Sequence, residues 1–152
     1  MKKEKLIKQT TQELLKKMSF KDAIIEVKKQ ENSSILVVSI QVDDANRLIG
    51  EGGSNLYDFQ RILRLLVAKK SSESFPFLLD INNYRKKREE FLKELSKELA
   101  EQVVKTKKSV MLQPMSSYER RIIHLELAEK SNVVTESIGE EPERRVVIKP
   151  RL

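Results

Sequence analysis

The sequence predicts an α+β protein built from two small domains. Apolar residues recur at helical spacing in long segments, and β-branched and apolar runs bounded by polar stretches lie between them. Three of the four glycines fall together within residues 50–53, where they separate two helical segments. A length of 152 residues, with 39% hydrophobic and 35% charged residues, suits one or two compact domains with a heavily charged surface.

The first half of the chain has the predicted order α-β-β-α-α-β. We expect a helix at 5–18, strands at 23–27 and 35–42, a short helix at 45–49, a longer helix at 54–70 and a strand at 77–81. Asp43 and Asp44 offer N-cap chemistry to the short helix. The longer helix is expected to bury Leu56, Phe59, Ile62, Leu63 and Leu66.

The second half has the predicted order α-β-α-β-β. We expect a helix at 83–106, a short strand at 110–112, a second helix after residue 116, and strands at 133–138 and 144–149 joined by an acidic turn. The apolar faces of these helices are Leu92, Leu95, Leu99 and Val103, then Ile122, Ile123, Leu125 and Leu127. Ser116 and Glu119 have the spacing of a capping box. A junction near Asn82 gives domains 1–82 and 83–152, with helix 83–106 bridging the junction.

Charge and composition limit the classes of function. Thirty Lys and Arg residues against 23 Asp and Glu residues give a net charge of +7, which favours a polyanionic partner. A basic protein without a nucleic-acid role is the simpler alternative. Without cysteine there are no disulfides or thiolate metal sites, and a single histidine excludes a multi-histidine zinc cluster, so we expect no metal and no cofactor. No apolar run approaches the roughly 20 residues that span a bilayer, and no signal peptide is recognisable, so we expect a cytoplasmic protein.

The turn Ile49-Gly50-Glu51-Gly52-Gly53 is the first candidate nucleic-acid site. Glycine has no Cβ, so Gly50 and Gly53 allow a tight turn and the close approach of a ligand. The free N–H groups at the start of the following helix would point toward an anion. The simpler alternative is an ordinary turn between two helices.

Basic side chains form the remaining candidate sites. Arg120 and His124 lie four residues apart, so a helix places both on one face, where a guanidinium can hold phosphate and an imidazole can contact phosphate or stack on a base. We expect Arg120 to be a surface residue that contributes little to folding; His124 is alternatively a satisfied structural residue. The other candidates are Arg85, Lys86, Lys87, Arg88, Arg121, Arg144 and Arg145. A solvated charge run, or an edge charge that discourages aggregation, is the alternative for the clusters at 85–88 and 144–145.

Both halves resemble known RNA-binding domains. The Gly-x-x-Gly turn at 50–53, within its order of strands and helices, resembles a KH domain of type II-like topology. Residues 84–89, Pro114-Met115, 118–124 and 141–148 resemble the R-three-H (Arg-x-x-x-His) domain of the bacterial Jag family. Members of this family, also called sporulation-associated RNA-binding proteins, are often encoded beside a membrane-protein insertase. The resemblance covers nearly the whole chain, with the KH part first and the R-three-H part second.

The resemblance implies a protein without enzymatic activity that binds single-stranded RNA, or single-stranded DNA, through the candidate residues above. It implies a post-transcriptional regulator, chaperone-like in action, linked to cell envelope, cell shape, cell wall organisation or division, with a small single-KH-domain protein as partner. The alternative is a protein-docking module whose turn no longer binds RNA strongly. Catalysis is disfavoured because the single histidine follows no nucleophile-elbow pattern and no Walker or Rossmann glycine pattern occurs.

The sequence departs from the Jag pattern at two places. Jag proteins commonly begin with an additional N-terminal domain and linker, whereas this sequence starts at the first KH helix, so we expect that domain to be missing. The variable positions of the KH turn usually include a basic residue, but here they are Glu51 and Gly52. A carboxylate repels a phosphate by about 1 kcal/mol at 4 Å in water, which weakens the case for strong RNA binding by this turn.

Overall fold

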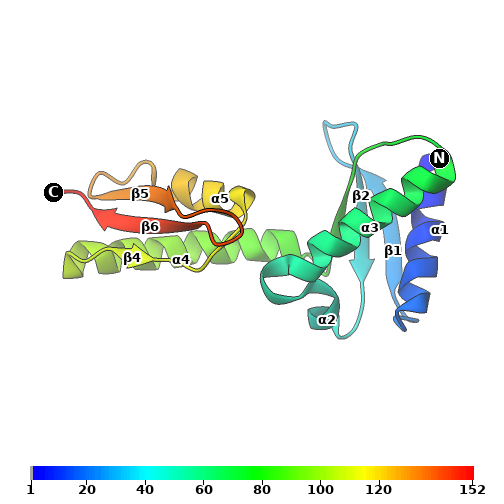
Figure 1. The fold of residues 1–152 in the computed structure, drawn as a ribbon, viewed down its shortest axis with the longest axis horizontal. Coiled ribbons are helices and arrows are strands. Elements are labelled where there is room, and N and C mark those ends of the chain that lie inside the picture. Colours follow the sequence, from blue (N-terminus) through cyan, green and yellow to red (C-terminus); the bar gives the residue numbers. More distant parts are fainter. Residues whose placement is uncertain (1) are drawn as a thin grey trace. The chain divides into compact units, whose positions relative to one another are not determined.

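The computed structural model describes residues 2–152 and divides into two compact units, the first ending at Arg85 and the second spanning Lys86–Leu152 (Figure 1). The first unit contains α1 (Lys2–Lys17), β1 (Ile24–Lys29), β2 (Leu36–Gln41), α2 (Ala45–Ile49), the 3-10 turn η1 (Glu51–Gly53), α3 (Ser54–Ser71) and β3 (Phe77–Ile81). The second contains most of α4 (Tyr84–Thr106), then β4 (Val110–Met111), α5 (Ser117–Leu127), β5 (Val133–Ile138) and β6 (Arg145–Pro150). The α+β class is therefore confirmed.

The first unit is a three-stranded sheet covered on one face by helices. β2 lies in the middle, antiparallel to β1 and parallel to β3. Burial alternates along β2 and β3, so that Leu36, Val38 and Ile40 share one face with Phe77, Leu79 and Ile81. Apolar residues of α1, α2 and α3 complete this core. The parallel pairing of β2 with β3 requires a long crossover, which α2 and α3 supply.

The buried stripe of α3 differs from the expected one. Leu56, Phe59, Leu63 and Val67 are buried, whereas Ile62 is 49% exposed and Leu66 is only half-buried. Ile62 lies about 100° around the helix from Leu63, which is enough to turn it away from the sheet. The expected N-cap is also wrong: Asp44 adopts a left-handed conformation, and its side chain makes no capping hydrogen bond.

The second unit packs α4 and α5 with a fully antiparallel sheet of order β4-β6-β5 (Figure 1). The buried stripe of α4 is Leu92, Ser96, Ala100 and Val103, while Leu95 and Leu99 lie half-buried at its sides. Small residues in the stripe let the helix approach its neighbours closely. On α5, Ile122, Ile123 and Leu127 are buried as expected, but Leu125 is 64% exposed. None of the helices described here is long and apolar enough to cross a membrane.

A glycine at position 50 is required by the turn between α2 and α3. Gly50 has φ 75° and ψ 175°, a combination open essentially to glycine alone. A Cβ there would lie 2.7 Å from Asn55 Cγ and 2.9 Å from the Asn55 backbone nitrogen. By contrast, Gly52 also has a positive φ, but nothing lies within 4 Å of the position of its Cβ.

We expect Gly50→Ala to lower the free energy of unfolding by about 1–3 kcal/mol, because it adds backbone strain and a steric clash. Gly52→Ala is the matched control and should cost about 1 kcal/mol, since it adds left-handed strain alone. Urea denaturation of the two variants measures the difference. Equal losses at both positions would show that the space around Gly50 is not the constraint.

Candidate nucleic-acid interface

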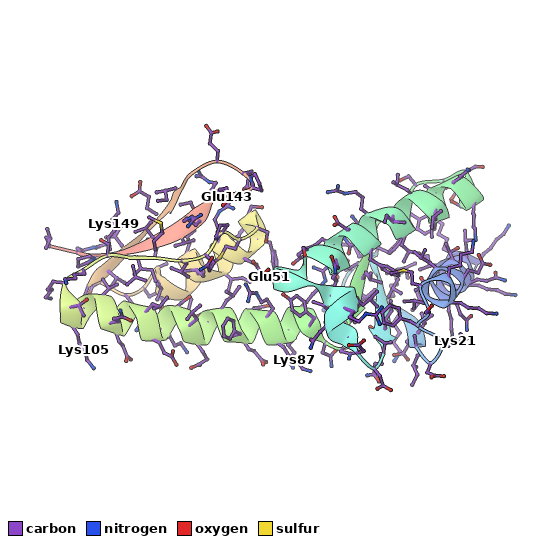
Figure 2. All side chains as sticks on the ribbon, turned by 60° about the horizontal axis from the view of Figure 1, so that its bottom comes forward. Lys21, Glu51, Lys87, Lys105, Glu143 and Lys149 are labelled. Atoms are coloured by element: carbon purple, nitrogen blue, oxygen red, sulfur yellow. The ribbon has the colours of Figure 1, made fainter. Side chains whose placement is uncertain are left out.

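The glycine turn exposes only two of its five residues. Ile49 is buried in the core of the first unit, and Gly53 is buried where a Cβ would meet the rings of Tyr84 and Tyr57 at 2.9 Å and 3.2 Å. Glu51 and Gly52 are exposed at the tip of the turn (Figure 2). The exposed tip of the turn therefore carries a carboxylate.

The basic run at the start of α4 separates into structural arginines and exposed lysines. Arg85 donates from Nε to the Leu79 carbonyl at 2.8 Å and from Nη2 to Gln60 at 3.0 Å, and its guanidinium lies over the ring of Tyr57. These contacts fix Arg85 against the first unit. Lys86 and Lys87 are exposed, and Lys87 projects from α4 (Figure 2).

Side chains of α3 and α4 form hydrogen bonds with backbone groups on the outer edge of β3. The Phe77 carbonyl accepts hydrogen bonds from Arg64, and the Leu79 N–H donates to Gln60 Oε1 at 2.8 Å. Together with the bond from Arg85 to Leu79, three backbone groups on this edge are paired with side chains. Arg85 is thus part of the fold of the first unit.

Arg120 is buried, which contradicts the expectation of a surface residue. It is 7% exposed, and its Nη1 donates to the Met115 carbonyl at 2.7 Å and pairs with Glu141 at 2.9 Å. Met115 precedes α5, and Glu141 belongs to the turn between β5 and β6. The motif arginine therefore joins α5 to the loop before it and to the acidic turn. A phosphate can approach this guanidinium only beside or in place of Glu141.

His124 lies on the same helix as Arg120, and its side chain faces strand β5. Its Nδ1 lies 2.7 Å from Thr135 Oγ1, and its Nε2 lies 2.8 Å from Ser137 Oγ. Burial of the ring, and next the positive charge of Arg120, hold the pKa of His124 below its usual value. Because a hydroxyl can donate or accept, either neutral tautomer is satisfied at this position. The structural alternative for His124 matches this geometry.

An ion pair with a buried carboxylate joins α4 to α5. Arg88 Nε donates to Glu119 Oε1 at 2.8 Å, and the side chain of Glu119 is only 5% exposed. Ser116 does cap α5, because its side chain accepts the Glu119 N–H. The Glu119 carboxylate, however, pairs with Arg88, which lies far away in the sequence. The sequence placed Glu119 in a capping box, so its role in the core was missed.

The remaining arginines differ in their surroundings. Arg121 is exposed on α5. Arg144 donates to the Gly139 carbonyl at 2.7 Å, and it precedes β6, which begins at Arg145. Arg145 pairs with Glu143 at 3.4 Å. The structure thus brings Arg120 and His124 together, and it engages Arg144 and Arg145 with the acidic turn that contains Glu143 (Figure 2).

Comparisons with known proteins cover both units. The R-three-H domain model matches residues 90–150. A protein of Clostridium symbiosum called RNA-binding protein KhpB is 44% identical over 82% of this chain and 56% of its own length. Proteins of the same name from Bacillus subtilis and Lactiplantibacillus plantarum are 38% and 37% identical, over 81% and 66% of this chain and 60% and 31% of their own. The chain therefore spans little more than half the length of the first two relatives.

We expect Arg120→Ala to lower the free energy of unfolding by about 1–3 kcal/mol, because it removes charged hydrogen bonds from a buried site. Arg121→Ala, the exposed neighbour, should change it by less than about 0.5 kcal/mol. Thermal unfolding of the two variants decides between a structural and a surface role for Arg120. A melting temperature equal to that of the unmodified chain in both variants would refute the structural role.

The exposed Glu51 generates a second prediction. Glu51→Lys replaces repulsion of a phosphate by attraction, so it should tighten binding of single-stranded RNA about ten-fold at low salt and less at high salt. Glu31→Lys, in the exposed segment between β1 and β2, makes the same charge change away from the turn. Binding titrations of both variants measure the difference. Equal gains would mean that RNA does not meet the glycine turn.

Proposed function

Since the chain contains an R-three-H domain and is homologous over most of its length to the RNA-binding proteins KhpB, the Jag family, we propose that it binds single-stranded RNA. The match of the R-three-H model to residues 90–150 carries this proposal. The net charge of +7 supports it, because release of counterions from phosphates favours binding to a basic surface.

In the second unit, the Arg120–His124 motif would mainly hold α5, β5 and the acidic turn in position, rather than bind phosphate itself. Both of its side chains are held by neighbouring residues, so the phosphate contacts fall to exposed cations. Lys86, Lys87 and Arg121 are such cations, and across the described residues no ion pair engages them. Where RNA displaces part of the acidic turn, phosphate contacts would also come from Arg120, His124, Arg144 and Arg145. Arg88 would support binding indirectly, through its ion pair with Glu119.

In the first unit, the order α-β-β-α-α-β with a Gly-x-x-Gly turn supports a KH domain. We propose that residues 49–53 contact the backbone of the RNA, with Glu51 limiting the affinity. The KH and R-three-H domains would correspond to residues 1–82 and 83–152, with α4 shared between them. Single-stranded DNA is a second ligand of the same chemistry.

The proposed role is regulation of gene expression after transcription, in the control of cell envelope, cell shape or division, in the cytoplasm and without catalysis. His124 and Ser137 lie at the distance of a base and a nucleophile, but the other ring nitrogen meets the hydroxyl of Thr135. Among residues 2–152 the hydrogen-bond partners of His124 are these two hydroxyls, and not a carboxylate that would stabilise a protonated imidazole.

A docking module is the second candidate function. Ile62 and Leu65 are 49% and 66% exposed on α3 of the first unit, and they lie three residues apart on one helix face. Exposed apolar side chains of this kind suit a protein partner. A small protein with a single KH domain is the partner that we propose for this face.

RNA binding should depend steeply on salt. If about four to six phosphates are neutralised, the logarithm of the affinity should fall with the logarithm of salt concentration with a slope of about −3 to −4. The double variant Lys87→Ala, Arg121→Ala should make this slope shallower by about 1.4, at about 0.7 per phosphate. Titrations of a mixed-sequence RNA at several salt concentrations measure it.

The control is the double variant Lys21→Ala, Lys105→Ala, which removes the same charge from two exposed positions outside the candidate set (Figure 2). Its slope should stay close to that of the unmodified chain. Failure of the unmodified chain to bind RNA at low salt would overturn the proposed function. Equal changes in both double variants would overturn the assignment of Lys87 and Arg121.

A further inference from the structure

Two aromatic side chains of the second unit lie exposed to solvent. Phe91 on α4 and Tyr118 on α5 are 54% and 59% exposed, and they are the aromatic members of the set of exposed large hydrophobic side chains among residues 2–152. An exposed aromatic ring does not contribute the favourable free energy that comes from burying its large apolar surface. Neither ring belongs to the hydrophobic core of the second unit.

Each of these aromatic residues shares a helix face with an exposed cation. Lys87 lies four residues before Phe91 on α4, and Arg121 lies three residues after Tyr118 on α5. Residues at these spacings are neighbours on a helix surface. The surface therefore offers the same combination twice, a ring beside a positive charge, on two helices of one compact unit.

The Arg88–Glu119 ion pair connects the two aromatic positions. The guanidinium of Arg88 lies 5.5 Å from the centre of the Phe91 ring, and the same guanidinium donates to Glu119, which directly follows Tyr118. Because the Glu119 side chain is only 5% exposed, separating it from Arg88 would leave a buried charge unpaired, which is costly in free energy. The Arg88–Glu119 ion pair therefore joins the two helix segments that carry Phe91 and Tyr118.

We propose that Phe91 and Tyr118 are base-stacking residues, on which nucleobases of single-stranded RNA stack while Lys87 and Arg121 contact adjacent phosphates. Aromatic rings next to cations are the combination with which proteins bind single-stranded nucleic acid, because every base has a π face and every nucleotide carries a charge. We call Lys87, Phe91, Tyr118 and Arg121 the stacking patch. The inference rests on the proposed RNA binding and names a contact beyond the glycine turn and the Arg120–His124 motif.

The charge of the stacking patch favours a nucleic acid over a protein partner. Lys87 and Arg121 are exposed, and the structure gives neither of them an ion pair within residues 2–152. The nearby Glu119 is buried and neutralised by Arg88, and Glu89 pairs with Lys93 at 3.1 Å. Two exposed acidic side chains lie near Phe91 on α4 and would repel a phosphate: Glu90, next to it, and Glu94, three residues after it, which lies 3.8 Å from Lys97.

The test compares alanine substitutions on the unmodified background of the full chain. Phe91→Ala and Tyr118→Ala should each weaken binding of a short mixed-sequence RNA by about five- to 150-fold, the range seen when a base loses its stacking partner. Leu125→Ala is the matched control, since Leu125 is an apolar residue on α5 that is 64% exposed. It should change the affinity by less than about two-fold. All three melting temperatures should stay close to that of the unmodified chain.

A gain-of-signal variant reports stacking directly. The chain has no tryptophan, so Tyr118→Trp places a single indole in the stacking patch and Leu125→Trp places one outside it. RNA should quench the fluorescence of the first indole and leave the second unchanged. An abasic oligomer, which keeps the charge and lacks the bases, should quench neither.

The outcomes separate the two proposals. Loss of affinity in both alanine variants together with base-dependent quenching supports the stacking patch. If the unmodified chain binds RNA but either readout fails, the stacking patch is wrong while RNA binding stands, and equal loss in the Leu125→Ala control has the same meaning. If the unmodified chain binds no RNA, both proposals fall. Selective capture of a protein by the patch, without RNA binding, would likewise overturn them.

Discussion

Two opposite charges buried next to one another at the start of α5 determine how the second unit is built. Glu119 and Arg120 both leave water, and a charge that leaves water needs a partner of opposite sign or several hydrogen bonds. Because the two side chains point in different directions around the helix, their partners come from different elements. Arg88 of α4 satisfies Glu119, while Met115 and Glu141 satisfy Arg120. One dipeptide thereby joins a helix, a loop and a turn that are far apart in sequence.

Much of the fold could be predicted from local patterns. Each expected helix and strand is present, with bounds that differ by a few residues, because apolar periodicity and glycine positions are local signals. The errors concern the direction of single side chains. Ile62 and Leu125 have the right chemistry for a core but lie at the edge of their helical stripes, and only the position of the sheet decides which edge is buried.

The candidate site was less predictable for the same reason. The sequence identified Arg120 and His124 by their spacing, but spacing does not reveal that Glu141, Thr135 and Ser137 occupy their polar atoms. Charge runs were equally ambiguous: Arg85 and Lys86 are neighbours in the chain, yet Arg85 donates a hydrogen bond to the edge of β3 and Lys86 is exposed. No local sequence pattern indicates that Glu119 is buried in an ion pair, since its partner Arg88 lies 31 residues away.

The side chains along β3 affect whether the sheet of the first unit can pair with a strand of another copy of the chain. An edge strand with unpaired backbone groups is a template on which another strand can add, and such addition can repeat without limit. With Phe77 and Leu79 already hydrogen-bonded to Arg64, Gln60 and Arg85, β3 offers a poor template. Only the β1 side of this sheet remains for strand addition, and a sheet that can grow from one side alone can pair once but cannot polymerise. The arginines of this edge therefore disfavour open-ended strand addition through the sheet of the first unit.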